Sequence, residues 1–262
     1  MGNILDDILK AKRIDLIMQK QLISIAKLEQ DMTTTAGKGR FKQELECSKL
    51  GFITEFKRKS PSKGWINREA NIETVVSNYE SVGATALSIL TDTPFFGGKP
   101  MDLLRARELT KLPILRKDFI IDEYQVVQSA AWGADAILLI AAALPKKELH
   151  KLARLAKSLG LDTLLEVHSK EELDYINEDI DVVGVNNRNL STFHTSIEVS
   201  IELASSIPAD CLKISESGIK TAEEISTLLQ LGYRGFLIGE HFMKHPDINK
   251  AFNSLNNLAY EG

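Results

Sequence analysis

Charged side chains in this sequence stand where short apolar runs end, and their types suit proton-transfer chemistry. Glu55 and Lys57 close one run, Lys117 closes another, and Glu166 and Glu216 close two more. Lysines and carboxylates act as general acids and bases when their surroundings shift their pKa values. Because a charged group at the end of a buried run is costly to desolvate unless it is paired or takes part in a reaction, the pattern indicates an active site.

Each of these groups also has a purely structural interpretation. Glu55 and Lys57 are two residues apart, so they share one face of a strand and could form no more than an ion pair. Polar residues follow two further runs, in Asn186-Asn187-Arg188 and Gly239-Glu240, and the run that Glu216 closes continues with Ser217-Gly218. A single residue of this kind could simply be an exposed polar side chain with no function, whereas polar groups at six of eight run ends favour a shared site.

The last two run ends have the residues of a phosphate site. Ser217-Gly218 and Gly239-Glu240 stand where many barrels bind a phosphate, through backbone N–H groups and a short helix N-terminus. Glycine permits the close backbone approach that a phosphate requires. Together with the basic segment Lys57-Arg58-Lys59, these residues predict a phosphorylated small-molecule substrate.

The elements that must position these residues are eight short runs rich in Ile, Leu and Val, each followed by a helix-like stretch. Such runs suit parallel strands buried on both faces. Eight strand–helix units in order predict an α/β fold, a single (βα)8 TIM barrel, and the 262 residues fit one. The runs are Gly51 to Lys57, Ala86 to Thr91, Leu112 to Lys117, Ala136 to Ile140, Thr163 to Glu166, Val182 to Asn186, Leu212 to Glu216 and Gly235 to Gly239.

An open doubly wound sheet is the alternative architecture. Such sheets usually have fewer strands and often carry a Gly-rich phosphate loop after the first one. The first run here ends in Lys57-Arg58-Lys59-Ser60-Pro61-Ser62, with neither G-x-G-x-x-G nor a P-loop, so the barrel is favoured.

Residues 1–46 stand outside the repeat, and residues 47–262 are expected to form the barrel, with no linker that would separate two domains. Ile4, Leu5, Ile8 and Leu9 have helical spacing, which predicts an N-terminal helical extension. Two roles remain open for this extension. It could plug one end of the barrel, or it could border the substrate pocket.

Composition excludes several other classes of protein. The net charge of −4 and pI of about 5.8 give no sign of a nucleic-acid partner. The longest apolar run, Ala136 to Leu144, is far short of the roughly 20 residues that span a bilayer. The first 20 residues carry charges that a signal peptide would not tolerate. With Cys47 and Cys211 read as reduced thiols, we expect a cytoplasmic protein with no membrane partner.

The segment Ile53 to Ser62 resembles the signature of the indole-3-glycerol-phosphate synthase family. The resemblance continues through nearly the whole chain, and the leader fits that family's N-terminal extension. One departure is Asn189, where members often carry Asp. The other matching segments are Ser88 to Asp92 with Phe96 and Gly98, Pro113 to Phe119, Leu138 to Ile140, Leu165 to Val167, Gly184 to Leu190, Ser215 to Ile219 and Leu237 to Glu240.

The resemblance implies a lyase of tryptophan biosynthesis, a carboxy-lyase. Its reaction closes 1-(2-carboxyphenylamino)-1-deoxyribulose 5-phosphate to indole-3-glycerol phosphate, with loss of carbon dioxide and water. The ketone oxygen must gain a proton and leave, which needs a general acid, and a cationic intermediate is stabilised by carboxylates. No metal or organic cofactor is implied, and we expect a monomer.

The resemblance also implies roles for single residues. Lys117 would be the general acid at the ketone oxygen and Glu166 the acid/base partner in the loss of water. Glu55 and Lys57 would orient the reacting groups, with Lys57 either holding the substrate carboxylate or serving as a second acid. The remaining implied residues are Asn186 and Ser217, which fix sugar hydroxyls and catalytic side chains; Ser60, Arg188 and Glu216, which bind polar groups; Phe119 and Leu138, which sandwich the aromatic ring; and Gly218, Gly239 and Glu240, whose N–H groups hold the phosphate.

Two other classes of function remain open from the residues. A Schiff-base aldolase on the same barrel would use Lys117 as its nucleophile. A non-catalytic phosphate-ligand binder could keep Gly218 and Gly239 but would not need the acids and bases. The presence of Glu55, Lys57, Lys117 and Glu166 together argues against such a binder.

Overall fold

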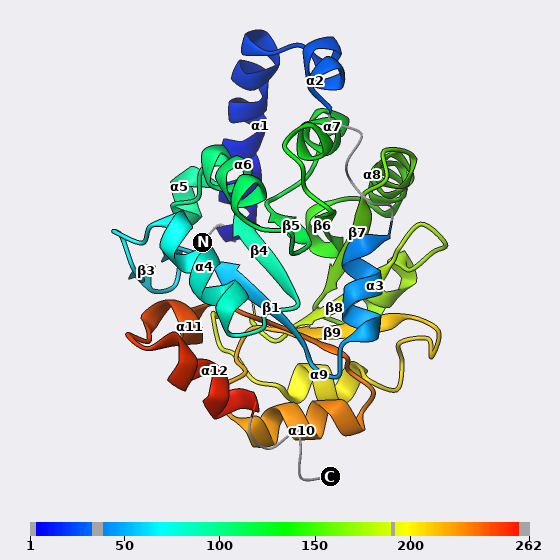
Figure 1. The fold of residues 1–262 in the computed structure, drawn as a ribbon. Helices are drawn as coiled ribbons and strands as arrows, with labels where there is room; N and C mark the ends of the chain where they lie inside the picture. The colour runs from blue at the N-terminus through cyan, green and yellow to red at the C-terminus, as the bar shows by residue number, and fades with distance from the viewer. Residues whose placement is uncertain (1–3, 33–38, 190–191, 257–262) are drawn as a thin grey trace.

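The structure is a computed structural model that describes residues 4–32, 39–189 and 192–256, and it is a closed barrel of parallel strands (Figure 1). The strands follow the order β1-β10-β9-β8-β7-β6-β5-β4, so the first pairs with the last. All eight predicted runs are strands of this barrel. Their bounds are β1 Gly51–Phe56, β4 Ala86–Leu90, β5 Ile114–Lys117, β6 Ala136–Ile140, β7 Asp162–Val167, β8 Val182–Asn186, β9 Leu212–Glu216 and β10 Gly235–Ile238.

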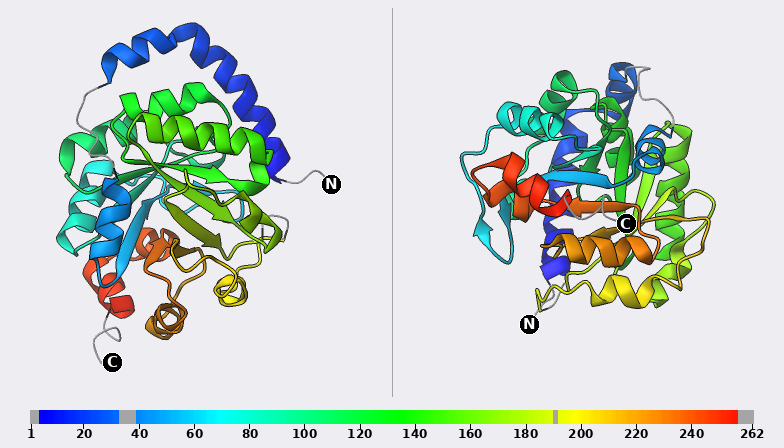
Figure 2. Two further views of the ribbon diagram at one scale, coloured as in Figure 1. Left: turned by 90° about the vertical axis from the view of Figure 1, so that its right-hand side faces the viewer. Right: turned by 60° about the horizontal axis from the view of Figure 1, so that its bottom comes forward.

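Helices surround the strands on the outside of the barrel (Figures 1 and 2). Several begin at a side-chain cap, as Thr221 and Glu224 do in the capping box of α10. The helices are α4 Ile72–Ser81, α5 Thr93–Phe96, α6 Pro100–Leu109, α7 Glu123–Ala131, α8 Lys146–Ser158, α9 Glu198–Leu203, α10 Ala222–Gln230, α11 Glu240–Lys244 and α12 Ile248–Asn256, with short 3₁₀ helices η1 Ala141–Ala143 and η2 Glu171–Tyr175.

The apolar side chains form two main layers, one on each face of the strands. The larger layer lies between the strands and the outer helices and includes Phe52, Leu139 and Val183. The smaller layer fills the barrel interior and includes Leu115 and Leu164. Every strand is therefore buried on both faces, which is why the sequence shows continuous apolar runs rather than alternation.

The N-terminal segment holds three helices, α1 Ile4–Leu22, α2 Ile25–Asp31 and α3 Arg40–Cys47. Helix α3 plugs the amino-terminal end of the barrel. Its Phe41 and Leu45 are fully buried in the interior layer, and the backbone N–H of Lys42 donates to Asp162, the first residue of β7, at 2.9 Å. The plugging role left open by the sequence is thus correct for α3.

Helices α1 and α2 run along the outside of the barrel over α7 (Figure 2). Leu16 of α1 and Leu28 of α2 pack there against Tyr124 and Val127. The first turns of α1 reach the carboxyl-terminal end of the barrel, where Ile4, Leu5 and Ile8 line a cavity. The second role left open by the sequence, a border of the substrate pocket, is therefore correct for α1.

A two-stranded antiparallel sheet of β2 Lys59–Ser60 and β3 Gly64–Trp65 follows β1 and was not predicted. Gly64 has a φ of 65°, which a residue with a side chain rarely adopts, and it allows the chain to reverse after Ser60 and Pro61. Strands of two residues give no periodic signal. The sequence consequently suggests only a basic loop at this point.

Two further expectations can be compared with the described part of the chain. Within it, no helix is long and apolar enough to cross a membrane. Cys47 is exposed, Cys211 is partly buried, and both are free thiols. Reduced cysteines were the expectation from their separation in the sequence.

Candidate active site

A cavity of about 700 Å³ opens at the carboxyl-terminal ends of the strands. This is the end where barrels of this kind carry their active sites. The cavity is lined by every residue that the sequence placed in the catalytic or substrate-binding set, namely Glu55, Lys57, Ser60, Lys117, Phe119, Leu138, Glu166, Asn186, Arg188, Glu216, Ser217, Gly218, Gly239 and Glu240. The closed barrel thus brings together residues that are far apart in the chain.

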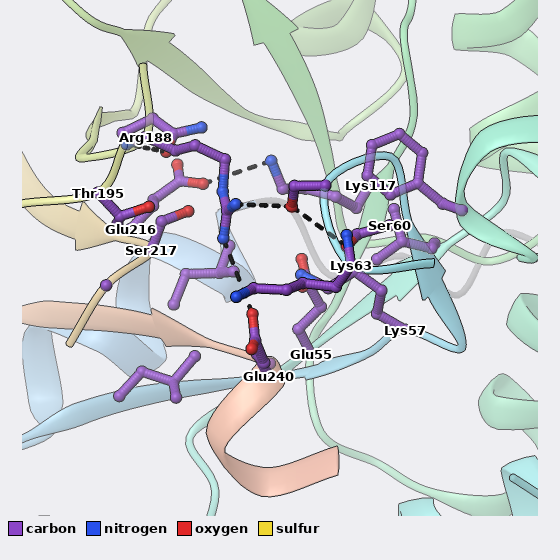
Figure 3. Close-up of a pocket in the computed structure, with 18 of the residues that line it drawn as sticks. Glu55, Lys57, Ser60, Lys63, Lys117, Arg188, Thr195, Glu216, Ser217 and Glu240 are labelled. Carbon is purple, nitrogen blue, oxygen red and sulfur yellow. Dashed lines mark hydrogen bonds and ion pairs between the residues drawn. The ribbon is translucent and has the colours of Figure 1, made fainter. Parts of the chain in front are cut away.

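Lys117 contacts two carboxylates in the cavity, on Glu166 and Glu216, of which Figure 3 labels Glu216. Its Nζ is 2.7 Å from Glu166 Oε2 and 3.3 Å from Glu216 Oε2. Burial alone would lower the pKa of Lys117, but Glu166, Glu216 and Glu55 raise that pKa well above its ordinary value. Lys117 therefore carries its proton when a substrate arrives.

The carboxylates around Lys117 differ in their affinity for a proton. Burial alone would raise the pKa of Glu166, but the charges of Lys117 and His168 lower it overall. Burial raises the pKa of Glu216 to about 7; Lys117 offsets this in part, whereas Glu166 adds to it. Among the described residues, Glu216 Oε1 has no hydrogen-bond partner although it is buried. Their different surroundings thus keep Glu166 ionised, whereas Glu216 titrates near neutrality.

Glu55 and Lys57 form the ion pair that their spacing in β1 suggested. Glu55 is buried, and Lys57 is partly exposed to the cavity. A Cβ atom at Gly239 would collide with the carboxylate of Glu55. A larger residue at position 239 would therefore force the carboxylate of Glu55 to shift at the rim of the barrel.

Backbone geometry is unusual where a phosphate was expected. Ser217 has a φ of 66° and Gly218 a φ of 77°, and Ser217 is one of two residues other than glycine with positive φ in the described chain. A Cβ at Gly218 would collide with the methyl group of Thr195. Gly239 precedes α11, so the first N–H groups of that helix, including that of Glu240, stand at the same side of the cavity.

Polar side chains extend from the loops over the cavity (Figure 3). Arg188 donates to Ser62 Oγ at 2.8 Å and lies 3.8 Å from Glu240 Oε2. Asn186 accepts a hydrogen bond from the backbone N–H of Arg188 at 3.1 Å. Ser60 Oγ accepts one from the backbone of Lys63 at 3.2 Å, which orders the loop after β1.

An apolar wall closes the opposite side of the cavity. Phe119 and Phe96 lie with ring centroids 5.9 Å apart, and Leu138 projects from β6. Ile4, Leu5 and Ile8 of α1 complete the wall. Phe96 was part of the family resemblance but had no predicted role, and a planar aromatic substrate group fits such a surface.

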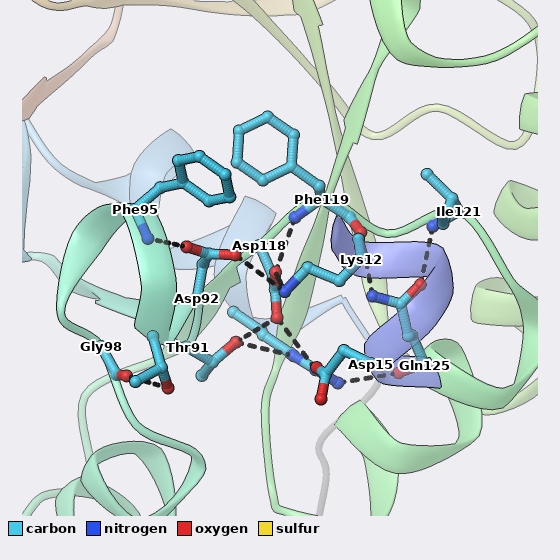
Figure 4. Close-up of polar contacts among 12 residues, drawn as sticks. Lys12, Asp15, Thr91, Asp92, Phe95, Gly98, Asp118, Phe119, Ile121 and Gln125 are labelled. Carbon is cyan, nitrogen blue, oxygen red and sulfur yellow. Dashed lines mark hydrogen bonds and ion pairs between the residues drawn. The ribbon is translucent and has the colours of Figure 1, made fainter. Parts of the chain in front are cut away.

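A buried ion cluster fastens α1 to this wall (Figure 4). Lys12 Nζ lies 3.0 Å from Asp92 Oδ2 and 2.8 Å from Asp118 Oδ1. Asp118 accepts from the backbone N–H of Phe119 at 2.8 Å, and Asp92 caps α5 through the N–H of Phe95. The cluster thus joins α1 to the loops that carry Phe96 and Phe119.

Sequence reasoning missed this cluster and also Lys63, His194 and Thr195 in the cavity lining. For Lys12 a signal existed, because it follows Ile8 by four residues and so lies on the buried face of α1. A lysine on the apolar, buried face of a helix is expected to form an ion pair with a buried carboxylate. No pattern in the sequence marked the segment around Thr195.

The family model for "Indole-3-glycerol phosphate synthase" matches residues 5–255. A protein of that name from Bacteroides thetaiotaomicron is 52% identical over 94% of this chain and 95% of its own length. One from Caldanaerobacter subterraneus is 41% identical over 92% of this chain and 93% of its own. This chain belongs to the indole-3-glycerol phosphate synthase family. Family membership confirms the predicted class, a carboxy-lyase of tryptophan biosynthesis.

Solved structures show the same fold at low sequence identity. A mutant tryptophan synthase alpha-subunit from Pyrococcus furiosus has a TM-score of 0.62 at 14% identity, covering 79% of this chain and 98% of that one. The 3-hexulose-6-phosphate synthase from Salmonella typhimurium has a TM-score of 0.64 at 11% identity, covering 80% and 98%. These similarities concern the barrel alone.

Proposed function

We propose that this indole-3-glycerol phosphate synthase closes the indole ring in the cavity at the carboxyl ends of the strands, with Lys117 as the principal general acid. The observation that carries the proposal is the contact of Lys117 with Glu166 and Glu216 inside the cavity. A protonated lysine held by carboxylates can give its proton to the ketone oxygen as the ring carbon attacks. The carboxylates then face the cation that forms.

Glu166 is the acid/base partner for the loss of water in this proposal. It is buried, ionised by its neighbours and 2.7 Å from Lys117. As a carboxylate, Glu166 can take up the proton that is released as the indole ring forms and pass it to Lys117, which gave up its own proton in the first step. Glu216 binds a polar group of the substrate and adjusts the charge around Lys117.

Glu55 and Lys57 orient the reacting groups. Their ion pair leaves Lys57 at the cavity surface, where it can hold the substrate carboxylate or act as a second acid. Asn186 and Ser217 contact the sugar hydroxyls and fix the catalytic side chains. Positioning of this kind supplies much of the rate in a reaction that joins two parts of one molecule.

The two ends of the substrate are bound on opposite sides of the cavity. Backbone N–H groups at Gly218, Gly239 and Glu240 hold the phosphate, supported by the close approach that glycine permits. Phe119 and Leu138 enclose the aromatic ring. Ser60 and Arg188 bind polar groups between them, from loops ordered by their own hydrogen bonds.

The direct test is to give the purified protein 1-(2-carboxyphenylamino)-1-deoxyribulose 5-phosphate and to follow indole fluorescence. We expect product formation without added metal or organic cofactor. Absence of product from protein with a native circular dichroism spectrum would refute the proposal.

A Schiff-base aldolase is disfavoured by the surroundings of Lys117. A Schiff base requires an unprotonated amine, whereas Glu166 and Glu216 keep this amine charged. Borohydride should therefore trap no adduct at Lys117 in the presence of the substrate. We also propose that the protein acts as a monomer in the cytoplasm, which sedimentation and cell fractionation would test.

A further inference from the structure

His168 stands directly behind the catalytic cavity, between two carboxylates. Its Nε2 lies 3.4 Å from Glu166 Oε1, and its Nδ1 lies 3.4 Å from Glu172 Oε2. The backbone N–H of His168 also donates to Glu172 Oε2 at 2.6 Å, so the loop after β7 holds both residues in place. Glu166 therefore contacts Lys117 through one oxygen and faces His168 with the other.

The polar atom that faces Glu166 is buried and unused. In the described structure, His168 Nε2 has no hydrogen-bond partner. Its distance to Glu166 is slightly longer than a hydrogen bond, and such contacts often shorten when a substrate binds. A buried imidazole nitrogen aimed at a catalytic carboxylate calls for a functional explanation.

His168 also lies between two cavities. The main cavity is lined by Glu166 but not by His168. A second cavity of about 280 Å³ is lined by His168 and Glu172, and it shares Asn186, Arg188 and His194 with the first. Its volume and polar lining suit several water molecules. The imidazole thus lies between the second cavity and the carboxylate that lines the first.

The reaction itself requires a supply of protons. The ketone oxygen must take up two protons to leave as water, and one proton is released as the indole ring forms. The substrate carboxylate leaves as carbon dioxide, which carries no proton away. Each turnover therefore consumes one proton, which Lys117 and Glu166 cannot provide by exchanging protons with each other.

We propose that His168 is a proton-relay residue that carries this proton from water in the second cavity to Glu166. The inference rests on the proposed role of Glu166. In the relay step the Nε2–H bond of the imidazolium breaks and an O–H bond forms on Glu166 Oε1. Glu166, which its neighbours otherwise keep ionised, is neutral only during this step. It gives the proton to the leaving hydroxyl, the C–O bond breaks, and the imidazole regains a proton from solvent through the second cavity.

The charges around His168 favour the imidazolium form that the relay needs. Glu166 on β7, Glu172 on η2 and Glu216 on β9 act on the ring. Burial alone would lower the pKa of His168, but these three carboxylates raise it overall. Arg188 and His194, which line the same cavity, are the cationic or titratable groups on the far side.

The first test is His168→Gln, which keeps an N–H donor near Glu166 but cannot pass a proton. We expect the single-turnover rate to fall at least about tenfold, with little change in KM. Added imidazole should restore the rate in proportion to the concentration of imidazolium. His150→Gln is the matched control, since His150 contacts the Tyr175 carbonyl outside the site and its loss should leave the rate unchanged.

The second test is Glu172→Gln, which keeps an oxygen to accept from the backbone N–H of His168 but removes the charge. Because Glu172 helps to raise the pKa of His168, its loss should lower that pKa. The alkaline limb of the pH–rate profile, where the imidazolium is lost, should then move to lower pH.

The outcomes separate the relay from a structural role and from the proposed function. A normal rate in His168→Gln would overturn the relay, and so would a reduced rate that imidazole or other buffer acids do not restore. An unmoved alkaline limb in Glu172→Gln would also count against it. Failure of the unaltered protein to form product would instead refute the proposed function.

Discussion

At the scale of single residues, the site is defined by a lysine that contacts two carboxylates. Lys117 is kept charged, Glu166 is kept ionised, and Glu216 titrates near neutrality. Three carboxylates around two lysines leave one excess negative charge when all are ionised. The raised pKa of Glu216 removes part of that excess by binding a proton.

The proposed acid/base roles predict large losses from single substitutions. Lys117→Ala and Glu166→Gln should each reduce turnover by more than ~10², the usual scale for a lost acid or base. Steady-state assays of product formation would measure both. Lys111→Ala changes an exposed lysine just before β5 and serves as control. Near-normal turnover in Lys117→Ala would remove that residue from the general-acid role.

Glu216 also predicts a pH-dependent stability. Its pKa in the folded protein, about 7, lies above its ordinary value of 4.5. The stability it contributes is therefore full below pH 4.5 and is lost as the pH rises through 7. Gln at this position is always neutral. The free energy of unfolding of Glu216→Gln, relative to that of the unaltered protein, should therefore increase by on the order of 1–3 kcal/mol from pH 5 to pH 8.

Denaturant unfolding of Glu216→Gln and of the unaltered protein at pH 5 and at pH 8 would measure this effect. Glu148→Gln, on the exposed face of α8, is the control, and its free energy of unfolding should differ from that of the unaltered protein by the same amount at pH 5 and at pH 8. A stability gain of Glu216→Gln that does not grow with pH would show that the folded protein does not hold a proton on Glu216.

Residue types and strand-end positions were predictable, whereas partnerships were not. The sequence places Lys117 and Glu166 each at the end of an apolar run. Their 2.7 Å contact spans 49 residues and depends on how the closed barrel sets β5 against β7. His168 gave no signal either, because its importance arises from a cavity formed by four separate segments.

At the scale of elements, helix α1 forms part of the wall of the cavity, and its buried Lys12 joins it to the loops that carry Phe96 and Phe119. Burial alone would lower the pKa of Lys12, but Asp118 and Asp92 raise it, so the pair of carboxylates holds a charged amine. The helix carries Ile4, Leu5 and Ile8 to the cavity. Docking of α1 and completion of the aromatic pocket are therefore coupled.

Lys12→Met should weaken both stability and substrate binding. The substitution leaves the buried carboxylates of Asp92 and Asp118 without their lysine, and removing one partner of a buried ion pair costs about 3 kcal/mol of stability. It also weakens the attachment of α1, which forms part of the apolar wall. We expect a severalfold increase in KM with a smaller change in kcat. Lys20→Met, on the same helix but in a half-exposed pair with Asp122, should cost less than about 1 kcal/mol and leave KM unchanged. Equal KM values for the two variants would contradict this role of Lys12.

The elements themselves were largely predictable, with informative exceptions. Eight apolar runs predicted eight strands because parallel strands are buried on both faces. The β2–β3 hairpin was missed because two-residue strands have no period. The extension was predicted as helical, but its two candidate roles were divided between α1 and α3, which reach opposite ends of the barrel.

The whole molecule separates catalysis from stability along the barrel axis. The carboxyl ends of the strands carry the charged cavity, and α3 fills the amino end with Phe41 and Leu45. Such a division is expected of barrels, whose catalytic loops lie at one end only. Closure of the barrel is what allows eight distant strand ends to share one cavity.

This separation predicts that α3 can be weakened without loss of activity in the folded protein. Leu45 is fully buried in the barrel interior, so Leu45→Ala should lower the free energy of unfolding by about 3 kcal/mol. Because no residue of α3 lines the cavity, kcat and KM measured well below the melting temperature should stay unchanged. A decrease in kcat without loss of folded protein would instead show that the plug at the amino end is coupled to the lysines and carboxylates at the other end.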